Sequence, residues 1–307
     1  MIFSILKLIC NKFLPPLFYN FLKKVYWNSK ETAYHPRRFK KRIYAKRISA
    51  PVWKNMKISI LCNVWNTPVD FLHQMVESVL SQNYRNWELL INNCSDCEHA
   101  YVDELLQKYA LDARIKIFRT KNQGIANNSN FILTKACGEF VFLLDHDDIL
   151  LPDTLEKLVA GQEKENSDFV YADEFVLQMD HMQLLKVPKK MFTMEALERD
   201  NFINHPALIR KSLLEQAGKF RDGFEGSQDH DLYLRVCEKT DKISYVPELL
   251  YVWRINEGSF SEKHLNICIN SGIKAVQEHL KRMNIPGKVV ADGNCTRYKI
   301  IDESHQV

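Results

Sequence analysis

The chain has 307 residues, of which 46% are hydrophobic and 26% are charged. This is an ordinary globular composition, and the length allows one large domain or two small ones. The net charge of +4 conceals an asymmetry, because residues 1–57 hold 14 Lys and Arg against one acid, Glu31. The remaining 250 residues therefore carry a net charge of −9.

The eight cysteines form no evenly spaced framework, and several lie inside apolar runs. This usage favours reduced thiols in a cytoplasmic protein over a disulfide-stabilised secreted one. Cys94 and Cys97 stand three residues apart, but no second Cys or His pair follows at metal-ligand spacing. Two free thiols in a turn are therefore expected here, in preference to a zinc or redox site.

The first 27 residues are apolar and aromatic, but lysines interrupt them and Pro15-Pro16 breaks any helix. No uncharged run is long enough to span about 30 Å of hydrocarbon, and no small-residue cleavage site indicates a secretory signal. A dense basic stretch follows at residues 35–47. Aromatic residues beside a basic cluster predict that residues 1–47 bind an anionic membrane surface. A solvated basic linker and a nucleic-acid contact are the alternatives.

From residue 57 onwards, short apolar runs alternate with segments of helical periodicity. The apolar runs are continuous, as in strands covered on both faces. The alternation predicts an α/β fold, in which a Rossmann-like, mostly parallel sheet carries helices on both faces. We expect strands at 57–65, 87–93, 114–120 and 140–145, helices at 68–82 and 100–111, and a polar, Asn-rich segment at 121–138.

The pattern changes from Phe169, where a polar, Met-rich loop separates two further apolar runs. Gly218 is expected to stop one helix and Ser227 to cap the next, in which Asp231 and Arg235 are spaced to pair. Asp292-Gly293 indicates the turn of a terminal hairpin. The expected strands are 168–177, 201–210 and 243–254, and the expected helices are 211–220, 226–240 and 266–286.

Three carboxylates follow the strand at 140–145, within Asp145–Asp148. Ligands of open parallel sheets bind beyond the carboxyl ends of the strands, where Asn63–Asn66 and Asn92-Asn93 should also converge. Asp145 and Asp147 are hard-oxygen ligands one residue apart, which favours Mg²⁺ or Mn²⁺ shared with substrate phosphates. An acidic turn without a metal is the alternative. The chain contains no phosphate-binding G-x-x-x-x-G-K-[ST] or G-x-G-x-x-G loop.

Several motifs occur in a fixed order around this site. The stretches "SVLSQNYRNWELL", "NQGIANNSN", "GEFVFLLDHDDILLP" and "NHPALIRKSLLEQAGKFRDGFEGSQDHDLYLR" are followed by "VPELLYVWR". Together they resemble glycosyltransferase family 2, the inverting enzymes with the GT-A fold, over about residues 57–262. The C-terminal helix and hairpin are similar to the end of bacterial O-antigen, capsule and lipopolysaccharide transferases.

The resemblance implies a role for each matching position. Asp147 would ligate the metal ion, Asp145 would contact the ribose or the metal, and Asp229 would be the catalytic base, which takes the proton of the acceptor hydroxyl. Arg254 would meet the diphosphate, or else form a structural ion pair. The implied donor-binding residues are Asn63, Trp65, Asn66, Asn93, Asn122, Gly124, Asn130, Asp145 and Arg254, and the implied acceptor-binding residues are His205, Gln228 and Trp253.

The chain departs from the family pattern at two positions. Asn92-Asn93 stands where relatives usually have an Asp pair, so the grip on the nucleotide would lack that charge. Val252 stands where relatives often have His, and it cannot ligate a metal ion. These departures leave open a second hypothesis, a non-catalytic subunit that binds a nucleotide sugar or a glycan.

The leading hypothesis is an inverting transferase that uses Mn²⁺ or Mg²⁺ and a nucleotide-diphospho-sugar, expected to be a UDP-sugar. Its acceptor would be a lipid-linked or lipopolysaccharide glycan at the inner face of a bacterial cytoplasmic membrane. RNA binding is disfavoured because the chain outside the basic arm is acidic. We expect a basic arm at 1–56, a donor half at 57–165, an acceptor half at 166–262, and a C-terminal helix and hairpin at 263–307 on the same domain.

Overall fold

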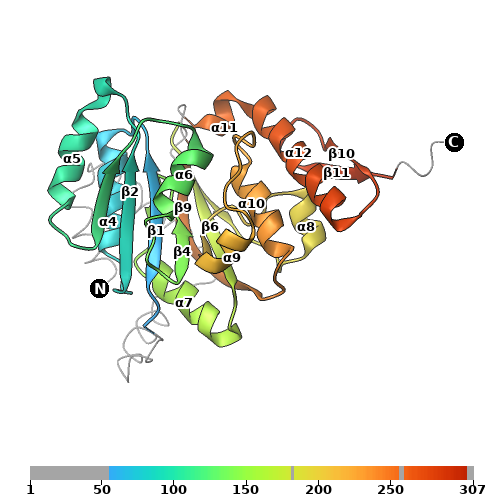
Figure 1. Cartoon of the computed structure of the whole chain (residues 1–307), viewed down its shortest axis with the longest axis horizontal. Coiled ribbons are helices and arrows are strands. Elements are labelled where there is room, and N and C mark those ends of the chain that lie inside the picture. Colours follow the sequence, from blue (N-terminus) through green and yellow to red (C-terminus); the bar gives the residue numbers. More distant parts are fainter. Residues whose placement is uncertain (1–54, 181–182, 256–258, 303–307) are drawn as a thin grey trace. The chain divides into compact units, whose positions relative to one another are not determined.

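The structure is a computed structural model that describes residues 55–180, 183–255 and 259–302. The predicted membrane-binding arm lies outside these residues. Nine of the described strands form one sheet in the order β3-β2-β1-β4-β8-β6-β9-β5, with β7 paired to β6 (Figure 1). The strands are β1 (Ile58–Val64), β2 (Trp87–Asn93), β3 (Ile115–Arg119), β4 (Phe140–Leu143), β5 (Ile149–Leu150), β6 (Phe169–Gln178), β7 (Gln183–Val187), β8 (Ala207–Arg210) and β9 (Ile243–Ile255).

The first half of the sheet is parallel, as the sequence predicts, since β1 pairs in parallel with β2 and β4, and β2 with β3. The second half is mixed, because β8 runs antiparallel to both β4 and β6. The helices are α4 (Val69–Leu80), α5 (Tyr101–Tyr109), α6 (Ile125–Leu133), α7 (Thr154–Glu165), α8 (Met194–Arg199), α9 (Lys211–Gln216), α10 (Gln228–Cys237), α11 (Phe260–Lys263) and α12 (Leu265–Met283), with a 3₁₀ turn at Cys97–His99.

Most predicted elements are confirmed, and three corrections follow. The Asn-rich segment contains helix α6, which buries Ala126 and Ile132 against the sheet. The polar loop after β6 contains β7 and α8. Strand β8 begins only at Ala207, so Asn201 to Pro206 form a connecting segment instead of a strand.

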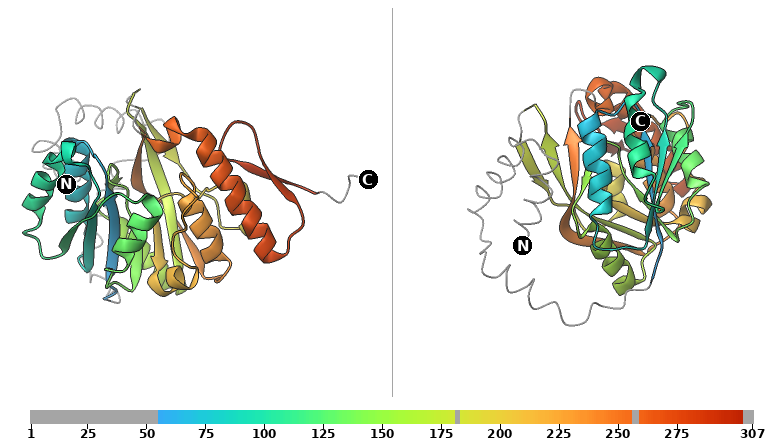
Figure 2. Two further views of the ribbon diagram at one scale, coloured as in Figure 1. Left: turned by 45° about the horizontal axis from the view of Figure 1, so that its top comes forward. Right: turned by 90° about the vertical axis from the view of Figure 1, so that its left-hand side faces the viewer.

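The central core lies where β4, β6 and β8 meet helices α6 and α8–α10. Phe169, Tyr171 and Tyr233 are fully buried there, and the Phe169 ring contacts both tyrosine rings. Helix α12 and the hairpin β10 (Lys288–Ala291) and β11 (Tyr298–Ile301) lie on the side of the domain opposite α5 (Figures 1 and 2). No helix in the described part of the chain is both long and apolar enough to cross a bilayer.

Candidate functional site

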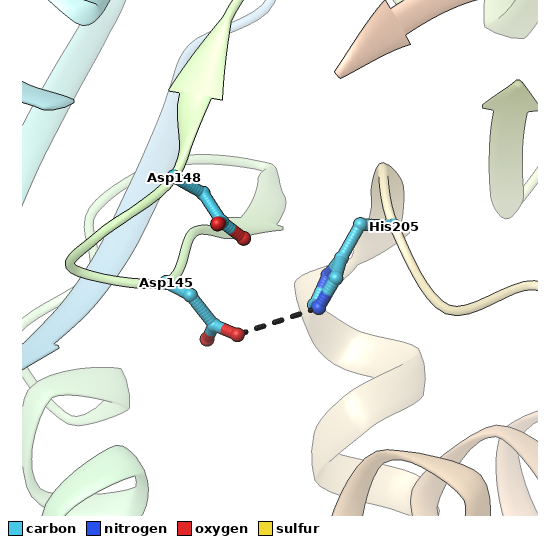
Figure 3. A group of neighbouring side chains, drawn as sticks. All are labelled: Asp145, Asp148 and His205. Atoms are coloured by element: carbon cyan, nitrogen blue, oxygen red, sulfur yellow. Dashed lines mark ion pairs between the residues drawn. The ribbon is translucent and has the colours of Figure 1, made fainter. Parts of the chain in front are cut away.

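The acidic turn after β4 contributes to a cluster of three possible metal ligands. Oxygen atoms of Asp145 and Asp148 and a ring nitrogen of His205 lie within 4.8 Å of one another. Figure 3 shows the three side chains pointing toward a common space. Asp145 and His205 form an ion pair of 3.4 Å, in which the carboxylate is 53% exposed and the imidazole 10%.

Asp148 is the buried member of this cluster, and two groups of β9 hold it. Its carboxylate accepts hydrogen bonds from the Tyr251 hydroxyl and the Arg254 backbone N–H, both at 2.7 Å. Burial, and then the charges of Asp147 and Asp145, raise the pKa of Asp148 well above its usual value. Three neighbouring acids at one turn therefore favour a bound cation.

His205 lies on the segment before β8, and its ring stacks on Tyr251 with centroids 4.9 Å apart. Burial lowers its pKa, but the hydrogen bond and charge of Asp145, with Asp148 and Glu174, raise that pKa to about 9. Its Nδ1 is buried and has no hydrogen-bond partner among the described residues. The imidazole therefore pairs with the acids when they hold no metal.

This donor set fits the expected ion. Carboxylate oxygens suit Mg²⁺ and Mn²⁺, and an added imidazole favours the transition metal. The sequence assigns Asp145 and Asp147 to the metal, whereas the structure groups Asp145 with Asp148 and His205. Asp147 is 20% exposed and lies 3.9 Å from the His146 ring nitrogen, so its role as a ligand stays a prediction. His205 places an imidazole beside the two acids, which Val252 cannot do.

Several asparagines of the predicted donor site use both ends of their amides within the protein. The Asn93 side chain is buried, donates to Asp103 and accepts from the Ser95 N–H. Asn130 bonds both backbone groups of Phe220, 90 residues away. These side chains shape the edge of the sheet, and a direct contact with a donor stays a prediction for each of them.

Asn66 and Asn63 lie at the carboxyl end of β1. The Asn66 amide exchanges two hydrogen bonds with Asp96, at a backbone φ of 51°. Asn63 donates to Ser129, while its carbonyl oxygen is buried without a partner among the described residues. Trp65 follows β1 with 54% of its surface exposed. The Asn63 carbonyl oxygen and the Trp65 ring are therefore available for further contacts at the carboxyl end of β1.

Asn122 and Gly124 form the turn before α6. The side-chain carbonyl oxygen of Asn122 accepts hydrogen bonds from the Gly124 backbone N–H and from the Asn128 side-chain amide. Gly124 has a φ of +87°, which residues with a Cβ rarely adopt. This turn therefore fixes where the α6 amino terminus meets the edge of the sheet.

Arg254 is buried near the acidic turn, with 1% of its surface exposed. Its guanidinium lies over the Phe71 ring at 4.1 Å and donates to Gln74. Nε and Nη1 have no hydrogen-bond partner among the described residues. Among the described residues the Arg254 side chain forms no ion pair, and its contact with a diphosphate stays a prediction.

Asp229 lies in the first turn of α10, half-buried, and accepts hydrogen bonds from the His230 N–H and the Asn201 amide. Gln228, just before it, has a buried carbonyl oxygen without a partner among the described residues. Trp253 on β9 is half-buried.

Ser227 begins the helix α10 but does not cap it with its side chain, since its hydroxyl donates to the Cys268 carbonyl.

The charges of Asp145 and Asp229 both act on the buried Tyr233 hydroxyl. Burial, and then the charges of Asp229, Asp145 and Glu174, raise the pKa of Tyr233 well above its usual value. Asp145 and Asp229 therefore both act on one buried hydroxyl, although 84 positions separate them in the sequence. That Asp147 and Asp229 face one cleft stays a prediction.

Sequence reasoning missed two polar residues of this site. Asp148 was one of three adjacent acids, and no local signal identifies which of them turns inward. Asn201 lay in a segment interpreted as a strand, where its contact with Asp229 could not be foreseen. The only available signal is an Asn three residues before the "NHP" motif, separated from it by Phe202 and Ile203.

Comparison with known proteins places this geometry in context. A family model described as "Glycosyl transferase family 2" matches residues 59–216. The protein y4gI of Sinorhizobium fredii is 34% identical over 73% of the chain, and the O-antigen biosynthesis protein RfbC of Myxococcus xanthus is 29% identical over 76%. The chain spans only 25% and 19% of these two relatives.

Solved structures show the same fold. Staphylococcus aureus TarS 1–349, in complex with UDP-GlcNAc, superimposes with a TM-score of 0.61 at 17% identity, covering 73% of this chain and 66% of that one. The predicted GT-A fold is confirmed. The matched family segment ends before α10, so Asp229 and the β9 residues lie outside it.

Proposed function

The chain belongs to glycosyl transferase family 2, and on that premise we propose that it transfers a sugar, with inversion, from a UDP-sugar to a hydroxyl group of a glycan. The observation that carries this proposal is the arrangement of the acids. Asp145 and Asp148 meet His205 in a candidate cation site, and a half-buried carboxylate, Asp229, accepts from Asn201, four residues before His205.

The donor would bind at the carboxyl edge of β1, β2 and β4. Arg254 supports this assignment because two of its nitrogen atoms are unpaired in a buried position and can donate to phosphate oxygens. Exposed Trp65 offers a flat surface for a base or sugar. The UDP-GlcNAc bound to TarS supports a UDP-sugar.

Asp145, Asp148 and His205 would hold Mn²⁺ or Mg²⁺, with Asp147 beside them. When bound, such an ion neutralises the charge that develops on the diphosphate as the sugar leaves. The chain's own residues prepare the site for it. Tyr251 and the Arg254 backbone hold the Asp148 oxygens, and the Tyr251 ring orients His205.

Asp229 would act as the general base. The acceptor oxygen attacks the anomeric carbon, the bond from that carbon to the diphosphate oxygen breaks, and Asp229 takes the hydroxyl proton. Its backbone is fixed in the first turn of α10. Gln228 and Trp253 would contact the acceptor.

The acceptor would be a lipid-linked or lipopolysaccharide glycan, presented at the inner face of a bacterial cytoplasmic membrane. The named role of RfbC in O-antigen biosynthesis supports a polysaccharide pathway. The basic and aromatic composition of residues 1–47 supports a peripheral membrane location.

The experiment is a nucleotide-release assay on the full chain with Mn²⁺, a panel of nucleotide sugars and a glycolipid extract. We expect acceptor-dependent UDP release, which Asp145→Ala and Asp229→Asn each reduce by about 100-fold or more. Asp241→Asn, an exposed acid before β9, is the matched control and should keep full activity. Donor binding without turnover on any acceptor would instead favour a non-catalytic subunit.

A further inference from the structure

Two donors from different elements hold the Asp229 carboxylate. The His230 backbone N–H donates to Oδ1 at 2.9 Å, from within α10. The Asn201 side-chain amide donates to Oδ2, also at 2.9 Å, from the segment between α8 and β8. Both oxygens are therefore engaged, which fixes the plane of the carboxylate.

The Asn201 amide is satisfied only at the end that faces Asp229. Its carbonyl oxygen is buried and accepts no hydrogen bond from a described residue. A buried acceptor without a donor destabilises the folded state. Asn130 shows the contrasting case, because it uses both ends of its amide to join two segments. Stabilisation of the fold therefore does not account for Asn201, and its contact with Asp229 does.

The segment that carries Asn201 also reaches the metal-ligand cluster. His205, four residues further on, pairs with Asp145. Between them, the Asn204 backbone carbonyl accepts from the Tyr233 hydroxyl at 3.1 Å. The Asn204 side-chain amide lies 3.4 Å from a carboxylate oxygen of Glu174. One short stretch of chain therefore contacts both the acid assigned to the donor side and the acid assigned to the acceptor.

We propose that Asn201 is a positioning residue for the catalytic base. It donates to Oδ2 of Asp229 and orients the carboxylate so that a remaining lone pair faces the acceptor hydroxyl. The proton passes from that hydroxyl to Asp229, and Asn201 itself exchanges none. This inference rests on the proposed function, because it assumes that Asp229 is the base.

Substitutions at Asn201 test the role directly. Asn201→Ala frees the Asp229 carboxylate to rotate. Misplacement of a reacting group by about 1 Å can lower the rate about 100-fold. We therefore expect kcat to fall about 10- to 100-fold with an unchanged KM for the donor. Asn201→Asp keeps the shape but places two carboxylates in contact. These would share a proton, so the acidic limb of the kcat/KM profile should move to higher pH.

The pH profile of Asn201→Asp distinguishes a positioning role from a purely structural one. If Asn201 only supported the fold, the acidic limb of the kcat/KM profile would stay at the wild-type pH. The other titratable neighbours are all unchanged in these variants, namely Asp200 of the same segment, His230, Asp231 and Tyr233 of α10, Cys268 of α12 and Tyr298 of β11. Asn83→Asp is the matched control, since Asn83 is an exposed residue between α4 and β2. Thermal melts of all variants should coincide within about 2 °C, a shift that corresponds to less than about 1 kcal/mol.

Asp229→Asn keeps the two possible failures distinct. Full activity in Asp229→Asn would overturn the proposed base and the inference with it. An inactive Asp229→Asn together with wild-type kcat in Asn201→Ala and an unshifted profile in Asn201→Asp would overturn the inference alone. A loss in Asn201→Ala that merely follows its unfolded fraction, without a profile shift in Asn201→Asp, would also overturn it.

Discussion

Two acids of α10, two residues apart, illustrate how local partners decide a role. Asp231 is fully buried and forms ion pairs with both Arg221 and Arg235, as its spacing from Arg235 predicts. Asp229 is half-buried, has no ion-pair partner among the described residues, and accepts only two uncharged donors. Asp231 is therefore committed to the fold, whereas Asp229 keeps capacity for a substrate.

Asp231→Asn should lower the stability of the protein. Arg235 is buried and would lose its counter-charge, which typically costs about 3–5 kcal/mol, so urea denaturation should show a marked fall in the free energy of unfolding. Asp229→Asn should change this free energy by less than about 1 kcal/mol. Equal losses in the two variants would contradict the division of roles.

Mn²⁺ should stabilise the protein in the absence of donor, and Mg²⁺ should do so less, because an imidazole ligand favours the transition metal. His205→Ala should remove most of the Mn²⁺-dependent rise in melting temperature. His99→Ala is the control, since His99 pairs with Asp96 and is not one of the three cluster residues. An unchanged Mn²⁺ response in His205→Ala would show that the ion binds elsewhere, for instance on Asp147.

At the scale of elements, the parallel half of the fold could be predicted because its signals are local. β1, β2 and β4 are short apolar runs, and α4 and α5 have one apolar face. β7 could not be predicted, because among the described strands it pairs only with β6 and its mostly exposed residues give no periodic pattern. Helix α6 was hidden by three asparagines, of which Asn127 and Asn128 bond within the preceding turn while Asn130 bonds Phe220, 90 residues away.

The site was predictable to the same extent. Asp145 and Asp229 could be proposed from the sequence because each follows a recognisable strand or begins a recognisable helix. The partners that define their chemistry were not, because Asp148 meets Tyr251 across 103 positions and Asn201 meets Asp229 across 28. Such contacts depend on the three-dimensional arrangement of loops, which a pattern of apolar residues does not specify.

Glu88 links three neighbouring strands and makes the sheet sensitive to acid. It is 2% exposed on β2, accepts from Ser59 of β1 and pairs with Lys116 of β3 and with Lys57. Burial raises its pKa, but the bonds from Lys116, Ser59 and the Cys137 N–H lower it from 4.5 to about 2. The folded state therefore binds this proton less readily than the unfolded state.

Glu88 should stabilise the fold above pH 4.5, and its contribution should be lost as the pH falls from 4.5 toward 2. We expect about 2 kcal/mol, reduced by screening because both lysines are nearly half-exposed. Urea denaturation of wild type and Glu88→Gln between about pH 6 and pH 2.5 measures this contribution. The difference in unfolding free energy should shrink over this range, and a constant difference would contradict an origin in the lowered pKa of Glu88.

At the scale of the whole domain, the C-terminal helix and hairpin support the elements that carry Asp229 and Asn201. His279 of α12 is fully buried and contacts Glu198 of α8 and Glu238 just after α10. The Tyr298 ring of β11 stacks on His230, the residue after Asp229. The site therefore depends on residues beyond the matched family segment.

Gly272 is the position where this dependence can be tested. A Cβ at Gly272 would overlap the hydroxyl of Tyr298 and contact its ring. Gly272→Ala should therefore displace Tyr298 from His230, which lowers the unfolding free energy by about 1–3 kcal/mol and reduces turnover through the Asp229 helix turn. Thermal melts and UDP release measure the two effects.

A double-mutant cycle identifies the cause. If the overlap with Tyr298 produces the loss, Gly272→Ala should cost little in a Tyr298→Ala background, so the two changes should be strongly non-additive. Additive losses would place the damage in α12 itself. Gly293→Ala probes general fragility of this region, because it lies in the hairpin turn with open space around it and a φ of +84°. It should lower stability through backbone strain while leaving the turnover of folded protein unchanged, since no side chain of the Tyr298–His230 stack has to move.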